Sequence, residues 1–521
     1  MSWNLLPLIP PGLLMLAAAL AFARPGRRPA GVPLLVEVAA IGALVATLAA
    51  ALVLGLVGAL SVRLSLAETI SLSVRLDTIG ATMLVLVAFV GWIVLRYSTR
   101  YLDGEDRQGA FLGWLAATLA AVLVLVQAGN LPTFLAAWIV SSLCLHRLLV
   151  FYPERAAARR AARKKFIVAR LSDAALALAF LVLAASCRTD DIPEILGLAA
   201  RGEATVGMSI AAALIAFAAL LKSAQFPTHG WLTEVMEAPT PVSALLHAGL
   251  INAGGFLLIR FADVLLTAPG VLAVLVLVGG GTALLGSLAM LTQPAVKTSL
   301  AWSTIAQMGF MIMQCGLALF SLALLHIVAH SLYKAHAFLS SGGAVERIAA
   351  LRRPGPVAVP GATAILAAFS LALIIYGAIS LAFGVEGKSP QALAVGAILI
   401  FGVAYLIAQG LADAAPWALT LRTGACSLLA AIGYFALQTG AEWLTAGSLP
   451  QTPAPGPLEW ALIVLAMTSF GLVALAQAAF PLWVGHPAAA VLRVHIANGL
   501  YANAIFDRLI GNWIDSRPAN H

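Results

Sequence analysis

The feature of this sequence that most constrains its fold is a succession of apolar runs of about 20 residues, separated by short connections. A run of that length spans the hydrocarbon core of a bilayer as an α-helix. Among the 521 residues, 61% are hydrophobic and 10% are charged, whereas roughly a quarter of the residues of a soluble domain are charged. We therefore expect an all-α, polytopic membrane protein.

The candidate spans number about 15. They cover residues 5–23, 33–57, 78–96, 110–127, 131–151, 166–186, 206–224, 241–261, 269–292, 298–317, 319–342, 361–384, 391–411, 420–438 and 458–483.

The net charge of +8 does not indicate a nucleic-acid partner, because the arginines and lysines lie in the short connections. The basic connections at 24–28, 154–165 and 346–355 all fall on one side of the predicted bundle. By the positive-inside rule that side is cytoplasmic. We therefore expect a protein of the bacterial inner membrane with a periplasmic N-terminus and a cytoplasmic C-terminus, whose surroundings are membrane lipids.

Ionisable side chains inside the expected spans are few. Such residues are costly in a bilayer unless they face protein or water, so each is a candidate for function. Lys222 is the first candidate, and Asp173 is its expected partner. His326, His330 and Lys334 are spaced four residues apart, which places them on one face of one helix, as a proton relay requires. The other candidates for an ion pathway are His146, His247 and Lys297.

The stretch from Lys222 to His247 contains three prolines and two carboxylates, Glu234 and Glu237. Prolines interrupt helices, and interrupted helices expose backbone groups that hold water or ions at membrane depth. Glu234 and Glu237 are therefore additional candidates.

The chain shows no metal-site pattern. Its four cysteines are far apart, and the pair His326 and His330 lacks a third ligand. We expect no cofactor in this chain and no enzymatic activity by itself. After the last span, residues 488–521 alternate apolar and charged side chains, which is typical of an amphipathic surface helix. This tail is expected on the cytoplasmic side, either on the leaflet or against a partner.

Five motifs identify a resemblance. They are KSAQFP at 222–227, HGWL at 229–232, MEAPTPVSALLH at 236–247, WSTIAQMGFM at 302–311 and HIVAHSLYKAHAFL at 326–339. Together they resemble the proton-translocating transmembrane family shared by the antiporter-like subunits of respiratory complex I and by Mrp-type cation/proton antiporters.

The resemblance implies two inverted five-helix repeats with broken helices. It divides the chain into N-terminal helices (1–109), a first repeat (110–267), a second repeat (268–411), C-terminal helices (412–487) and the tail (488–521). By the same resemblance, the channel residues fall on Asp173, Lys222, His247, Lys297, His326, His330 and Lys334.

Three departures from the family pattern stand out. Ile139 follows Trp138 where the family usually has glutamate, Ala295 replaces an acid, and the span at 361–384 carries no charge. These departures argue against a standard complex I pump. The stretches LCLHRLLVFY at 143–152, KAHAFLSSG at 334–342 and HIANGLYANAIFDRL at 495–509 instead resemble the membrane subunits of Dab-type inorganic carbon accumulation complexes. That resemblance implies a cytoplasmic DabA-like partner with a carbonic-anhydrase-like zinc site, and a role in coupling H⁺ or Na⁺ flow to CO₂ hydration and bicarbonate accumulation.

Two alternatives stay open. One is an antiporter-like proton-translocating subunit of a respiratory complex I or hydrogenase-type complex. The other is a structural scaffold for a peripheral enzyme.

Overall fold

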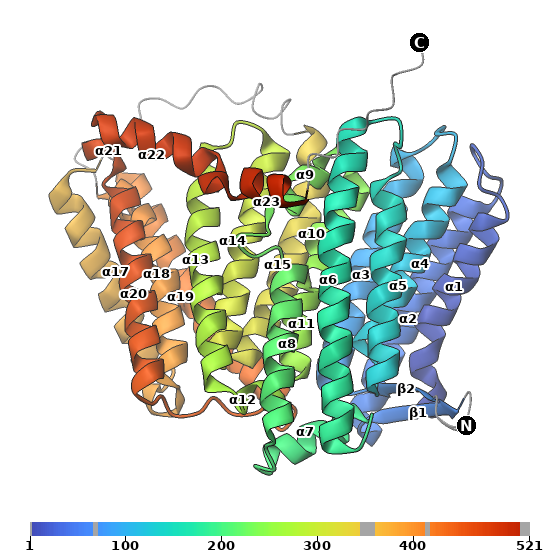
Figure 1. The fold of residues 1–521 in the computed structure, drawn as a ribbon. Coiled ribbons are helices and arrows are strands. Elements are labelled where there is room, and N and C mark those ends of the chain that lie inside the picture. Colours follow the sequence, from blue (N-terminus) through green and yellow to red (C-terminus); the bar gives the residue numbers. More distant parts are fainter. Residues whose placement is uncertain (1–2, 66–70, 344–359, 412–416, 511–521) are drawn as a thin grey trace.

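The helices form a bundle that runs between two opposite faces (Figure 1). The computed structural model describes the chain except residues 1–2, 66–70, 344–359, 412–416 and 511–521. The chain enters the bundle at the face that carries a short β-hairpin, and its last described helices lie along the opposite face. We call these the hairpin face and the tail face.

Each of the candidate spans coincides with a helix or with a pair of helices. These are α1 (Ile9–Phe22), α2 (Val32–Val57), α3 (Thr78–Tyr101), α4 (Gln108–Val126), α5 (Leu131–Leu149), α6 (Ala156–Cys187), α8 (Val206–Lys222), α10 (Thr240–Ala248) with α11 (Ala253–Arg260), α13 (Pro269–Thr292), α14 (Val296–Gly316), α15 (Phe320–Leu339), α17 (Ala362–Ala382), α18 (Pro390–Gly410), α19 (Trp417–Thr445) and α20 (Pro457–Ala478).

Among the described residues, 12 segments are long and apolar enough to cross a membrane. The chain is therefore an all-α, multi-pass membrane protein. The other three expected spans, α8, α14 and α18, are helices that fall short of one of those criteria of length or hydropathy.

Short elements join these helices. They are η1 (Trp3–Leu8), α7 (Ile192–Ala200), α9 (Gly230–Glu234), η2 (Val235–Glu237), η3 (Leu250–Asn252), α12 (Ala262–Leu266), η4 (Ser341–Gly343) and η5 (Val385–Gly387).

Local sequence explains where several helices start. The Asn130 side chain accepts a hydrogen bond from the Thr133 backbone N–H, which caps α5, and a proline follows in the first turn. Ser389 caps α18 in the same way. Small residues bring α13 and α14 together, because a Cβ on Gly279 would lie 2.6 Å from the Met313 backbone nitrogen. That close approach is the packing that glycines permit between membrane helices.

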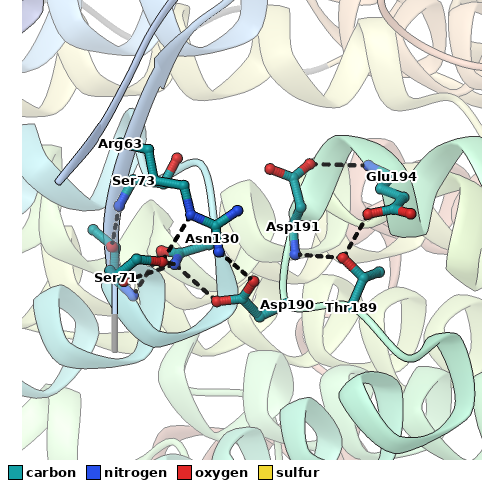
Figure 2. Close-up of polar contacts among 9 residues, drawn as sticks. Arg63, Ser71, Ser73, Asn130, Thr189, Asp190, Asp191 and Glu194 are labelled. Atoms are coloured by element: carbon teal, nitrogen blue, oxygen red, sulfur yellow. Dashed lines mark hydrogen bonds and ion pairs between the residues drawn. The ribbon is translucent and has the colours of Figure 1, made fainter. Parts of the chain in front are cut away.

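The sequence did not lead us to expect the hairpin. Strands β1 (Leu60–Ser65) and β2 (Ser71–Leu76) pair antiparallel. Figure 2 shows how polar side chains fasten it to the bundle. Asn130 donates to the Ser71 carbonyl at 2.8 Å and to Asp190 at 3.0 Å, and Arg63 pairs with Asp190 at 3.1 Å. The hairpin thus ties α3 to the starts of α5 and α7.

The resemblance implies a broken helix in each repeat, and the described residues show such a break in the first. The chain between α10 and α11 leaves helical geometry at Gly249 and passes through η3. Five membrane helices lie in residues 110–267 (α4, α5, α6, α8 and α10/α11), and five lie in 268–411 (α13, α14, α15, α17 and α18). In the second set α17 is continuous, since its apolar sequence contains no proline.

The tail lies along one face of the bundle (Figure 1). It consists of α21 (Phe480–Trp483), α22 (Pro487–Ala497), η6 (Gly499–Tyr501) and α23 (Ala502–Ile510). The Gln293 side chain donates to the Ala497 carbonyl at 3.2 Å. Gly499 has a positive φ of 55° and packs where a Cβ would meet the Trp302 ring at 2.8 Å, so this contact requires glycine. The basic connections at 24–28 and 154–165 lie on this same face, whereas 346–355 lies outside the described residues.

Candidate functional site

Lys222 ends α8 in the interior of the first repeat. Its ammonium lies 4.2 Å from the centroid of the Trp138 ring on α5. The nitrogen is buried and has no hydrogen-bond partner among the described residues. Trp138 itself is fully buried. A cation over an indole face in a desolvated site is stabilised by about 2 kcal/mol or more, so the aromatic ring is the closest support for this charge.

Asp173, the expected partner, interacts with Lys222 electrostatically but does not form a direct ion pair with it. Its carboxylate pairs instead with Arg170 at 2.6 Å, one turn earlier on α6. Asp173 and Lys222 are therefore electrostatic neighbours without a direct ion pair in the described part of the chain. The reason is that Arg170 reaches the carboxylate from the same helix.

His146 does not take the place of the missing glutamate. Its ring packs on Phe166 at 5.1 Å, and its Nδ1 is buried without a partner. The charges that act on it are the cations Lys165, Arg147 and Arg170. A histidine among cations supplies no negative charge, so it cannot balance Lys222 as a carboxylate would.

Lys165 is a buried cation that the sequence analysis missed. Its Nζ donates to the Ser142 carbonyl at 2.8 Å and to the Ser142 hydroxyl at 2.9 Å. Lys165 also interacts electrostatically with Lys222 and Asp173. It was assigned to a basic connection because α6 was expected to start near residue 166, whereas the helix begins at Ala156.

His247 and Lys334 face the second repeat. The Nδ1 of His247 lies 3.0 Å from the Thr304 hydroxyl, and its ring stacks on Phe338 at 4.3 Å. Lys334 is fully buried and donates to Ser303 Oγ at 2.8 Å and to the Leu300 carbonyl at 3.2 Å. Both side chains therefore contact α14, which brings them to one side of the same helix.

His326, His330 and Lys334 form a row on α15. The rings of His326 and His330 have centroids 6.2 Å apart, about one helical turn. The Nδ1 of His326 lies 3.0 Å from Gln314 Oε1, while both ring nitrogens of His330 are buried without a hydrogen-bond partner. Such unpartnered groups are expensive in a packed interior.

The break between α10 and α11 lies between the two halves of this site. Two cavities of about 20 Å³ flank it, and both touch Gly249 and Leu250. One cavity reaches Lys222 and the other reaches Asn252. A cavity of that size holds about one water molecule. The side chains of the first repeat thus approach those of the second through the break.

Asn252 is a second residue that the sequence analysis missed. It is buried and donates to the Ser331 hydroxyl on α15 at 2.8 Å, next to His330 in the chain. Its own Oδ1 has no hydrogen-bond partner. A neutral amide in a broken helix gives no signal in a list of charged residues, which is why it was overlooked.

The remaining candidates lie toward the tail face. Lys297 donates to the Thr240 hydroxyl at 3.1 Å. Glu237 pairs with Arg155 at 3.7 Å, and both side chains are about half exposed. Glu237 is therefore part of a surface pair, and no contact connects it to the interior row.

Glu234 belongs to a partly buried cluster, the tail clamp, made of Lys164, Glu234, Asn503 and Asp507. Lys164 donates to Glu234 at 2.5 Å and to Asn503 at 3.0 Å, and it also pairs with Asp507. Beside the clamp, burial and then the charge of Lys164 lower the pKa of His229 to about 4, so His229 is neutral at physiological pH. Glu234 therefore anchors the tail.

The described residues contain no group of three histidine, cysteine or acidic side chains that could hold a metal ion. The four cysteines are free and separate.

The broken membrane helix and the buried ionisable side chains on either side of it are those of an antiporter-like, cation-translocating membrane subunit. The family model described as NADH:quinone oxidoreductase/Mrp antiporter, TM matches residues 128–353, and one described as NADH-Ubiquinone oxidoreductase (complex I), chain 5 N-terminus matches 65–112. The solved Mrp complex from Dietzia contains a chain with the same fold. Its TM-score is 0.64 at 23% identity, over 99% of this chain and 61% of that one.

The curated relatives narrow the class. The probable inorganic carbon transporter subunit DabB2 of Halothiobacillus neapolitanus is 37% identical over 84% of this chain and 80% of its own length. The probable subunit DabB of Hydrogenovibrio crunogenus is 46% identical over 54% of this chain and 55% of its own length. NADH-ubiquinone oxidoreductase chain 5 of Metridium senile is 34% identical over 53% of this chain and 46% of its own length. The chain belongs to the DabB family of probable inorganic carbon transporter subunits.

Proposed function

We propose that this chain conducts H⁺ or Na⁺ for an inorganic carbon accumulation complex of the bacterial inner membrane. The cation moves inward and drives CO₂ hydration at the zinc site of a separate, DabA-like cytoplasmic protein. Bicarbonate then accumulates in the cell. The observation that carries the proposal is the set of buried ionisable side chains that crosses from Lys222 through the broken helix to the α15 row.

The energetics are adequate for such coupling. One elementary charge that crosses the membrane releases about 2.3 kcal/mol per 100 mV of membrane potential. That energy shifts an equilibrium by roughly fiftyfold, since about 1.4 kcal/mol corresponds to a factor of ten. One cation per turnover is therefore enough to bias hydration toward bicarbonate.

The side chains suit transfer between neighbours. A cation that enters near Asp173 changes the field at Lys222, whose ammonium has no hydrogen bond to fix it. The water-sized cavities at Gly249 and Leu250 then offer a route to Asn252 and Ser331. On α15 the charge reaches His330 and Lys334, which lie one turn apart.

The tail face is the docking side in this proposal. The tail clamp anchors α23, but several apolar side chains of the tail remain exposed on this face. They are Val491, Val494, Leu500, Ile505 and Leu509. In this proposal the N-terminus is periplasmic, and the basic connections at 24–28 and 154–165 on the tail face support that orientation.

A respiratory subunit is the second candidate. The identity of 34% to NADH-ubiquinone oxidoreductase chain 5 favours it. The uncharged α17 disfavours it. Purification at native expression, followed by identification of the co-eluting chains and their metals, separates the two. A zinc protein supports carbon accumulation, and quinone-reductase subunits support the respiratory alternative.

The function is tested with Lys222→Ala in cells that depend on the complex for inorganic carbon. We expect bicarbonate accumulation to be lost while the complex still assembles. Arg201→Ala is the matched control, because Arg201 pairs with Glu203 on the surface, and it should accumulate normally. Normal accumulation by an assembled Lys222→Ala complex would refute the role of Lys222.

A further inference from the structure

Lys388 is a buried cation outside the site described above. It lies in the connection between η5 and α18, and its side chain is only 5% exposed. A lysine buried in a membrane bundle is costly and marks a functional position by default. The helix that ends just before it, α17, contributes no charged residue.

The contacts that Lys388 makes with described side chains are long. Its Nζ lies 3.5 Å from the Thr439 hydroxyl, 3.8 Å from the Glu442 carboxylate and 5.7 Å from the centroid of the Phe435 ring. A charge-assisted hydrogen bond that holds a structure together is normally about 2.7–2.9 Å long. The ammonium therefore has an acid within reach but is not locked to it.

Glu442 connects this lysine to the exterior and to a buried amide. Its side chain is 44% exposed. The fully buried Gln438, one turn earlier on α19, donates to the Glu442 carboxylate at 2.9 Å, while the Oε1 of Gln438 has no partner. A buried amide oxygen without a partner is a site where a water molecule binds.

Gln438 lies at the depth of the first histidine of the row. Ser321, at the start of α15, bonds Thr445, at the end of α19, with 2.7 Å between the hydroxyl oxygens. His326 is five residues beyond Ser321, and Gln438 is seven residues before Thr445. At 1.5 Å per residue these separations are about 8 and 10 Å, so His326 and Gln438 lie nearly level in neighbouring helices.

We propose that Lys388 and Glu442 are the proton-exchange pair at the outer end of the second repeat. After Lys388 has released a proton inward, Glu442 takes a proton from the outer solution and gives it to the Lys388 amine, which regenerates the carboxylate and the ammonium. The ammonium passes that proton to water beside Gln438, toward the α15 row. One proton moves in each step, and the pair returns to its starting state. This inference rests on the proposed cation conduction.

The test compares Lys388→Met and Lys388→Arg in the purified complex in liposomes, with potential-driven proton uptake as the readout. Arginine keeps the charge but cannot release a proton, so both variants should fall at least tenfold below wild type. Wild-type uptake by Lys388→Arg would overturn the exchange role, because a structural cation would then suffice. Wild-type uptake by both variants would overturn the site altogether.

Two further variants make the result decisive. Lys334→Met, measured in the same assay, tests the conduction itself. If Lys334→Met also retains wild-type uptake, the proposed function fails. If Lys334→Met loses uptake while the Lys388 variants keep it, only the role of Lys388 fails. If the Lys388 variants do not fold, the exchange role is tested instead with Glu442→Gln, because Glu442 is the exposed member of the pair. Uptake several-fold below wild type supports the exchange pair, and unchanged uptake overturns it.

Discussion

Replacing Lys334 with methionine should slow cation movement without unfolding the protein. Lys334 makes two hydrogen bonds, to Ser303 Oγ at 2.8 Å and to the Leu300 carbonyl at 3.2 Å. A hydrogen bond to a charged group contributes about 1.5–3 kcal/mol. Without the Lys334 ammonium and its two hydrogen bonds, the transferred charge loses about 3–6 kcal/mol of stabilisation. That loss corresponds to a flux roughly 10² to 10⁴ times lower. Methionine fills nearly the same space, so packing around α15 should be kept.

The assay is potential-driven uptake of H⁺ or Na⁺ into liposomes that contain the purified complex. Arg201→Ala serves as the control for handling and orientation, since its surface pair is remote from the row. Thermal unfolding in detergent checks that the variant is folded. A folded Lys334→Met complex with flux within twofold of wild type would refute the reasoning, because the buried ammonium would then carry no transferred charge.

Three other predictions test separate parts of the account. Trp138→Leu removes a cation–π contact worth about 2 kcal/mol, so liposome flux should fall roughly thirtyfold; unchanged flux would contradict this. Arg260→Ala should lower the free energy of unfolding by about 3–5 kcal/mol, measured in detergent, because it strands the buried Asp77. Burial raises the pKa of Asp77, but the charge and hydrogen bond of Arg260, the backbone hydrogen bond from Gly80 and the charge of Arg75 together lower it by more. The stabilisation by Asp77 is therefore present above about pH 4 and lost as pH falls, and Asp77→Asn should weaken that acid sensitivity. Deleting 491–521 should release the cytoplasmic partner, as should Ile505→Asp on the exposed tail, whereas co-purification of both variants with the partner would remove the docking proposal.

The membrane helices could be predicted because a bilayer imposes a length that is readable in the sequence. The hairpin could not, since LSVRLS and SLSVRL are short and sit between much stronger helical signals. The start of α6 was misplaced for a related reason. Its basic first turns look like a connection, but Lys164 and Lys165 are buried by the tail clamp and by Ser142.

The candidate site was predictable where one helix places the residues. His326, His330 and Lys334 follow directly from helical spacing. Trp138 and Asn252 could not be found in this way, because their roles arise from contacts between elements distant in sequence. Glu234 was assigned to the pathway from its place between prolines, whereas the tail, some 270 residues later, binds it.

The most direct measurement compares potential-driven cation uptake by liposomes containing the wild-type complex, the same complex with Lys222→Ala, and no protein. The account predicts uptake by the wild type well above the protein-free rate, and uptake by Lys222→Ala close to it. Equal uptake by wild-type and protein-free liposomes, or full uptake by the variant, would contradict the claim that these buried groups carry a cation across the membrane.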